Sequence, residues 1–172
     1  AGNGGMIAAA YAAKNGLNLR IIEQNAGVQD TRHWVGAVDG FGAQENGVVT
    51  DKKKLLSEIS RYASGKCDQR VVKVWLDESG EAIGFIREIM EDEFGVPMTY
   101  THGEEARWPD ANAEENTDYI YPEIEYTYDR STGAERNKLL QQYIEDLGYS
   151  IDFNTALAKL EKDDTGRITG II

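Results

Sequence analysis

Cysteine and histidine are both scarce in this chain. Its 172 residues include one cysteine, Cys67, and two histidines, His33 and His102. A single thiol excludes an internal disulfide and a cluster of cysteine ligands, and two isolated histidines do not make a histidine-rich metal site. Neither histidine has a partner at a recognisable spacing. We therefore predict no metal site and assign no catalytic role to either histidine.

Basic residues are also fewer than acidic ones. The chain has 18 lysines and arginines against 30 aspartates and glutamates, a formal net charge of −12, and its basic run is Lys52–Lys54. Binding to nucleic acid or to an anionic membrane surface requires a basic face, so we expect neither partner. No apolar stretch approaches the ~20 residues of a membrane-spanning helix, so we predict no spanning segment.

Glycine, by contrast, is placed informatively at the start of the chain. Ala1, Gly2, Asn3, Gly4 and Gly5 match the last five positions of G-x-G-x-x-G, a turn between a strand and a helix that binds dinucleotides. The second glycine of this pattern lets the backbone approach a pyrophosphate, and the third lets the helix pack closely on a sheet. The helix also directs its free N–H groups toward the phosphates. Because the first glycine and its strand are missing from the sequence, we expect a fragment of a larger protein.

An acidic residue follows this turn at an informative distance. Residues 6–14 favour a helix, Gly16 suits its left-handed stop, and residues 19–22 favour a short buried strand. Glu23 ends that strand, 21 positions after Gly2 (23 − 2), where an acid accepts hydrogen bonds from a ribose diol. We interpret the segment as a dinucleotide site rather than a chance turn. An acid here favours FAD or NAD over NADP, and it does not separate FAD from NAD.

These residues resemble a known family. The run Gly2-x-x-Gly5-x3-Ala9-x6-Gly16-x6-Glu23 is similar to the FAD-binding start of the fumarate reductase and succinate dehydrogenase flavoproteins. That group includes aspartate oxidase and ketosteroid dehydrogenases. Residues 31–39 fall where the family has a loop against the flavin, residues 68–85 resemble its following long helix, and residues 154–172 resemble its adenine-side strand and hairpin.

The resemblance implies further cofactor-binding residues. Gln24 follows the ribose acid, and Thr31, Arg32 and Gly36 lie in the loop that the family places against the flavin. Leu157 would hold adenine through its backbone N–H and C=O. The alternative for the three loop residues is a plain surface loop, and for the Leu157 side chain an ordinary strand position.

The order of predicted elements is α/β. We expect one Rossmann-like FAD-binding domain over residues 1–172 that lacks its first strand and carries a helical and acidic insertion at about 51–128. Within the insertion, Thr50 or Asp51 caps one helix, Asp68 caps a longer one, and an edge strand lies near residues 123–126. A capping box at 132–135 opens another helix, and a β-meander over residues 150–172 ends the chain.

For the full-length parent, the resemblance implies hydride transfer between FAD and an activated alkene such as fumarate, a small-molecule substrate. A ketosteroid dehydrogenase and a non-catalytic Rossmann-type nucleotide-binding module are the alternatives. The substrate-binding capping domain and the catalytic residues lie outside the chain. We therefore expect the chain alone to be inactive, to hold no FAD, and to self-associate through its exposed sheet.

Overall fold

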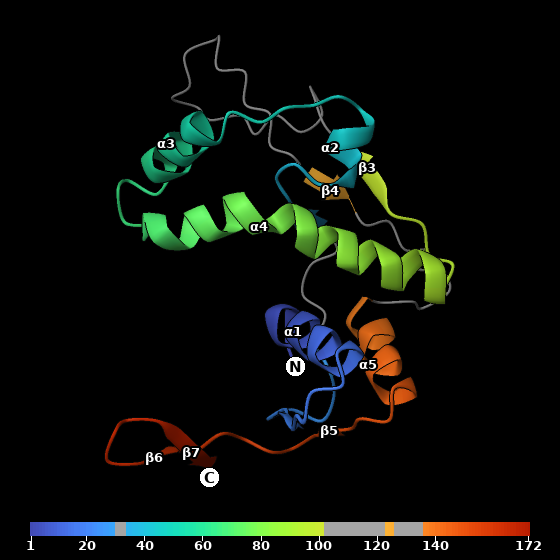
Figure 1. The fold of residues 1–172 in the computed structure, drawn as a ribbon, viewed down its shortest axis with the longest axis vertical. Coiled ribbons are helices and arrows are strands. Elements are labelled where there is room, and N and C mark those ends of the chain that lie inside the picture. Colours follow the sequence, from blue (N-terminus) through green and yellow to red (C-terminus); the bar gives the residue numbers. More distant parts are fainter. Residues whose placement is uncertain (30–33, 102–122, 126–135) are drawn as a thin grey trace. The chain divides into compact units, whose positions relative to one another are not determined.

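The computed structural model describes residues 1–29, 34–101, 123–125 and 136–172. They divide into two compact units (Figure 1). Unit 1 consists of Ala1–Thr31 and Arg130–Ile172, and unit 2 of Arg32–Asp129. Both contain helices and strands, which confirms the predicted mixed α/β class. The predicted capping box at 132–135 lies outside the described residues.

Two helices form the core of unit 1. α1 (Asn3–Lys14) and α5 (Arg136–Asp146) lie side by side (Figure 1). Small side chains on α1 allow this close packing. The buried apolar residues of the pair are Met6, Ala9, Ala10, Ala13, Leu140, Tyr143 and Ile144. α1 is followed by Gly16 at φ +66°, a left-handed conformation that glycine adopts without steric cost. The predicted helix and its glycine stop are confirmed.

A short parallel sheet completes the core of unit 1. β1 (Ile21–Ile22) pairs with β5 (Ile151–Asp152), Ile21 opposite Ile151 and Ile22 opposite Asp152. The pairing continues beyond the strands, because Glu23 N donates to Asp152 O at 2.9 Å and Thr155 N donates to Glu23 O at 2.8 Å. The carboxyl ends of both strands therefore lie next to each other, and Glu23 is held at that edge.

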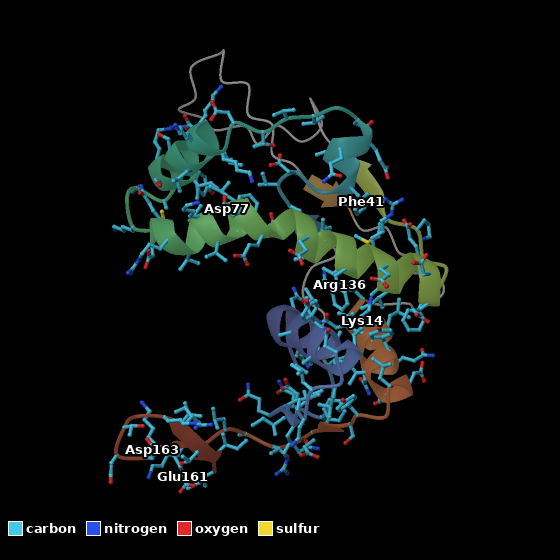
Figure 2. All side chains as sticks on the ribbon, in the orientation of Figure 1. Lys14, Phe41, Asp77, Arg136, Glu161 and Asp163 are labelled. Carbon is cyan, nitrogen blue, oxygen red and sulfur yellow. The ribbon has the colours of Figure 1, made fainter. Side chains whose placement is uncertain are left out.

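The end of the chain is a hairpin rather than the predicted three-stranded meander. β6 (Leu160–Lys162) pairs antiparallel with β7 (Ile168–Ile171), whereas β5 pairs with β1 instead of joining them. α5 directly precedes β5, and a helix of this kind is the usual connection into a parallel strand. In the hairpin turn, Asp163 Oδ1 accepts from Thr165 N and Arg167 N at 2.9 and 3.0 Å (Figure 2).

The helices of unit 2 begin at acidic caps. α3 (Lys52–Tyr62) is capped by Asp51, whose Oδ1 accepts from Lys53 N and Lys54 N at 3.0 Å. α4 (Gln69–Arg87) is capped by Asp68 and continues into a π-helical segment, η1 (Glu88–Glu93). Both predicted helices are confirmed, with Asp51 rather than Thr50 as the first cap. None of the helices in the described ranges is long and apolar enough to cross a membrane.

Unit 2 contains a short strand and a short helix soon after Glu23 in the sequence. β2 (Trp34–Gly36) and the short helix α2 (Phe41–Glu45) lie within the glycine-rich stretch after Glu23. β4 (Glu123–Glu125) pairs on one side with β2 and on the other with β3 (Thr99–Thr101). The predicted edge strand near residues 123–126 is therefore the central strand of a three-stranded antiparallel sheet.

The segment that follows β2 is fixed against α4. Ser79 Oγ accepts from Val38 N at 2.8 Å, and Trp75 Nε1 donates to Gly36 O at 3.0 Å. Gly80 completes the contact, since a Cβ there would lie 2.7 Å from Val38 O and 2.9 Å from Asp39 O. Val38 is buried with Leu55 and Leu76 in the apolar cluster between α3 and α4. One side of α4 thus determines where residues 36–39 lie.

Adding a methyl group at Gly80 tests this close approach. We expect Gly80→Ala to lower the free energy of unfolding by about 1–3 kcal/mol, because backbone carbonyls must shift to admit the Cβ. Gly84→Ala, one turn further along α4, is the matched control. Nothing lies within 4 Å of a Cβ at Gly84, so this change should stabilise the helix by about 0.5–1 kcal/mol. Urea denaturation followed by circular dichroism measures both, and equal effects would contradict the proposed contact.

Candidate dinucleotide-binding site

The glycine turn leaves the start of α1 open. Gly2 is the N-cap, with extended backbone (φ −87°, ψ −178°) and no capping side chain, and Met6 N donates to its carbonyl at 2.9 Å. Among the described residues, no acceptor meets the backbone N–H of Gly4 or Gly5. A Cβ built at Gly2, Gly4 or Gly5 has nothing within 4 Å. Free N–H groups at the positive end of a helix, with room before them, suit an anion such as a pyrophosphate.

Gly5 lies in the first turn of α1. We expected its lack of a side chain to allow close packing of α1 on a sheet. Nothing within the described ranges lies within 4 Å of a Cβ at this position. The close packing of α1 that the structure does show involves Ala9, Ala10 and Ala13, all buried. The close packing of α1 on a sheet at Gly5 stays a prediction.

Glu23 is a buried acid at the carboxyl end of β1. Its side chain is 7% exposed. Glu23 Oε1 accepts from Asn25 N at 2.8 Å and from Asn25 Nδ2 at 2.7 Å, and Oε2 accepts from the amino group of Ala1. The Ala1 bond first, and then the Asn25 bonds, hold the pKa of the Glu23 carboxyl below its usual value. The residue is therefore a carboxylate at neutral pH, the form that accepts hydrogen bonds from a diol.

The structure brings the first residue of the glycine turn close to Glu23. The contact between the Ala1 amino group and Glu23 Oε2 joins the first residue of the turn to the acid. Gln29 N donates to Ala1 O at 3.2 Å, so the segment after Glu23 also returns to the turn. Gln24, the next predicted residue, is exposed beside Glu23. Unit 1 thus gathers the groups suited to a phosphate and a ribose at one place.

Asn137, on α5, is a residue of this site that sequence reasoning missed. It is fully buried, and its Nδ2 donates to Asn3 Oδ1 at 2.9 Å and to Gln29 O at 2.5 Å. It therefore connects the turn with the segment that follows Glu23. No sequence signal identifies it, because it lies 134 positions from Asn3 in a helix whose pattern predicts only amphipathic packing.

The remaining predicted residues lie in other segments of the chain. Thr31 and Arg32 lie outside the described residues. Gly36 is in β2 of unit 2, where its carbonyl accepts from Trp75. Leu157 lies between β5 and β6 with its side chain 51% exposed. Within the described part of the chain, its backbone N–H and C=O make no hydrogen bond, so both are available to a ligand such as adenine.

Metal ligands do not gather at the site. Nowhere in the described ranges do three or more histidine, cysteine, aspartate or glutamate residues form a group that could hold a metal ion. Cys67 lies in unit 2, where its Sγ is 3.7 Å from Ser60 Oγ. The chemistry available in unit 1 is hydrogen bonding to an anion and to hydroxyl groups.

A comparison with protein families identifies the fold around this geometry. Residues 1–172, the whole chain, match the family described as FAD binding domain. The chain belongs to the FAD-binding domain family. The resemblance of the Gly2–Glu23 run to FAD-binding flavoproteins is thereby confirmed. No curated protein matches the chain by sequence.

Two solved structures share its fold. The open conformation of a flavocytochrome c3 fumarate reductase matches with a TM-score of 0.71 and 16% identity, over 99% of this chain and 28% of that protein. The 3-ketosteroid-Δ4-(5α)-dehydrogenase from Rhodococcus jostii RHA1, in complex with 4-androstene-3,17-dione, matches with a TM-score of 0.67 and 18% identity, over 96% of this chain and 38% of that protein. The chain therefore spans about a third of the length of these proteins.

The ionisation of Glu23 gives a testable pH dependence in the chain that begins at Ala1. Its pKa is lower in the folded chain than in the unfolded one, where it takes the ordinary value of 4.5. The stabilisation is thus present above that value and is lost as the pH falls through the lowered pKa. Urea unfolding should show Glu23→Gln less stable than the unsubstituted chain at neutral pH, with the difference shrinking in acid. A difference that stays constant with pH would contradict this role.

Proposed function

We propose that this chain is the FAD-binding portion of a flavin-dependent oxidoreductase. The observation that carries the proposal is the closeness of the glycine turn to Glu23 and to the segment after it, where Gln29 N donates to Ala1 O, in a chain that belongs to the FAD-binding domain family. Phosphate-facing N–H groups and a ribose-facing carboxylate must lie together to bind the ADP half of a dinucleotide. The closeness of the Gly2–Gly5 turn to Glu23 in unit 1 supports the proposal.

The residues present fit the ADP half of FAD. The open N–H groups of Gly4 and Gly5 suit the pyrophosphate, with Gly2 and Asn3 completing the turn. Glu23, with Gln24 beside it, suits the ribose hydroxyls. The free backbone N–H and C=O of Leu157 match the hydrogen-bonding edge of adenine. FAD, when bound, supplies hydride-transfer chemistry, and the protein orients the cofactor and adjusts its reduction potential.

The flavin half of the proposal concerns residues 31–39. Thr31, Arg32 and Gly36 are proposed to line the isoalloxazine because of the family resemblance of this segment. The hydrogen bonds from α4 to Gly36 and Val38 support a fixed path for residues 36–39. A fixed loop is what a cofactor-lining segment requires, because the protein tunes a flavin through groups held near its ring.

For the reaction, we propose reduction of an activated alkene of a small molecule, as in the fumarate reductase that shares the fold. Oxidation of a ketosteroid is the second candidate, because a ketosteroid dehydrogenase shares the fold as well. Both proteins are much longer than this chain. The groups that bind and protonate a substrate are therefore proposed to lie in other parts of the natural protein.

Cofactor content tests the proposal directly. We expect the natural protein that carries this chain to purify with FAD, or to take up one equivalent, and to show the visible absorption bands of oxidised flavin. Chromatography of the released cofactor distinguishes FAD from NAD. Recovery of NAD without flavin would favour the alternative, a non-catalytic Rossmann-type module. A protein that neither contains nor binds FAD would contradict the proposal.

The role of Glu23 is tested by removing its charge. In the natural protein stripped of cofactor, we expect Glu23→Gln to weaken FAD binding by about 10- to 100-fold, since a hydrogen bond to a charged group contributes about 1.5–3 kcal/mol. Glu145→Gln, an exposed change on α5, should leave the affinity unchanged. Titration by flavin fluorescence measures both variants. Equal FAD affinities for Glu23→Gln and the control would show that Glu23 does not contribute to FAD binding.

A further inference from the structure

One buried side-chain amide links the two chain segments that make up unit 1. Asn137, the second residue of α5, is fully buried beside α1. Its Nδ2 group donates to Asn3 Oδ1 at 2.9 Å and to Gln29 O at 2.5 Å. A primary amide has two N–H donors, and here each is directed to a different segment. One side chain therefore fixes the distance between the turn and the segment that follows Glu23.

The two acceptors are themselves linked. Gln29 N donates to Ala1 O at 3.2 Å, and Ala1 contacts Glu23. Asn3 is two residues from Ala1 across Gly2. Asn137, Asn3, Ala1 and Gln29 thus form a closed ring of covalent and hydrogen bonds. A ring of this kind restricts the turn more than any one of its bonds would alone.

The turn needs such a restraint because its own residues provide little. Gly2, Gly4 and Gly5 have the widest conformational freedom of any residue, and a Cβ at each would touch nothing. An anion site made of backbone N–H groups is effective only when those groups already point at the ligand, since ordering them on binding costs conformational entropy. Asn3, between Gly2 and Gly4, is the residue of the turn through which a side chain can impose order.

We propose that Asn137 is a positioning residue that holds the glycine turn in the arrangement that receives the pyrophosphate of the cofactor. The inference rests on the proposed FAD-binding function and extends it to a residue of the distant helix α5. Asn137 acts through Asn3 and does not itself contact the cofactor. Its removal should therefore weaken the binding of ligands that carry phosphates and spare those that do not.

A comparison of ADP with adenosine separates positioning from a purely structural role. In the natural protein stripped of cofactor, Asn137→Leu keeps the forked shape of the side chain, with a somewhat larger volume, and removes both donors. Calorimetry should show ADP binding weakened by about tenfold or more, the equivalent of one hydrogen bond, and adenosine binding changed by less than about twofold. Gln141→Leu, one turn along the same helix, is the matched control and should change neither affinity.

A second variant keeps the test decisive if Asn137→Leu does not fold. Asn3→Ala removes the acceptor from the partly exposed turn and leaves the buried amide in place. It should show the same selective loss of ADP affinity. Where Asn137→Leu folds, the double variant should lose no more than the larger single loss, because both changes break one link. Fully additive losses would show that the residues act separately and would overturn the inference.

The other outcomes are equally distinguishable. The unsubstituted protein and the variants could bind ADP equally tightly while the unsubstituted protein also binds FAD. That result would support the proposed function and contradict the positioning role of Asn137. Equal weakening of ADP and adenosine would show a general structural effect and would also overturn the role. If the unsubstituted protein binds neither FAD nor ADP, the proposed function and the inference fall together.

Discussion

The arrangement of unit 1 depends on hydrogen bonds that cross from the first helix and strand to the last ones. The pairing of β1 with β5 holds Glu23 beside Asp152 and Thr155, and the Asn137 amide holds the glycine turn beside α5. A turn rich in glycine has no preferred shape of its own. The glycine turn and Glu23 therefore both contact residues more than a hundred positions away in the chain.

In unit 2, too, a segment is held by residues distant in the chain, through hydrogen bonds and a close backbone contact. α4 carries an indole donor, a hydroxyl acceptor and a glycine on one side, and together these determine the path of residues 36–39. Lys52 adds an ion pair to this segment, with its Nζ 3.1 Å from Asp39 Oδ2. Arg87 fastens α2 to the other end of the helix, over the ring of Phe41 at 4.1 Å and 2.8 Å from Glu45 (Figure 2). α4 thus contacts both α2 and residues 36–39 and holds them in place within this unit.

Local chemistry explains what the sequence could and could not predict. The stop at Gly16, the caps at Asp51 and Asp68 and the position of Glu23 follow from nearby residues, and each was found from the sequence. The central place of β4 and the pairing of β5 with β1 depend on partners distant in the chain, which the pattern of a three-residue strand does not specify. Asn137 was missed for the same reason, because a buried polar residue is explained only by the groups that surround it.

The pairing of β1 with β5 also has a consequence for the order of folding. Arg20 and Asp152, joined at 2.6 Å beside these strands, are 132 positions apart, and all of unit 2 lies between them in the sequence. Contacts between residues so far apart slow folding, although the entropic cost of closing the loop grows only slowly with its length. During synthesis, unit 2 emerges from the ribosome complete while α1 and β1 still await their partners. We expect the glycine turn to reach its final shape only after α5 and β5 have been made, because its partners lie in these elements.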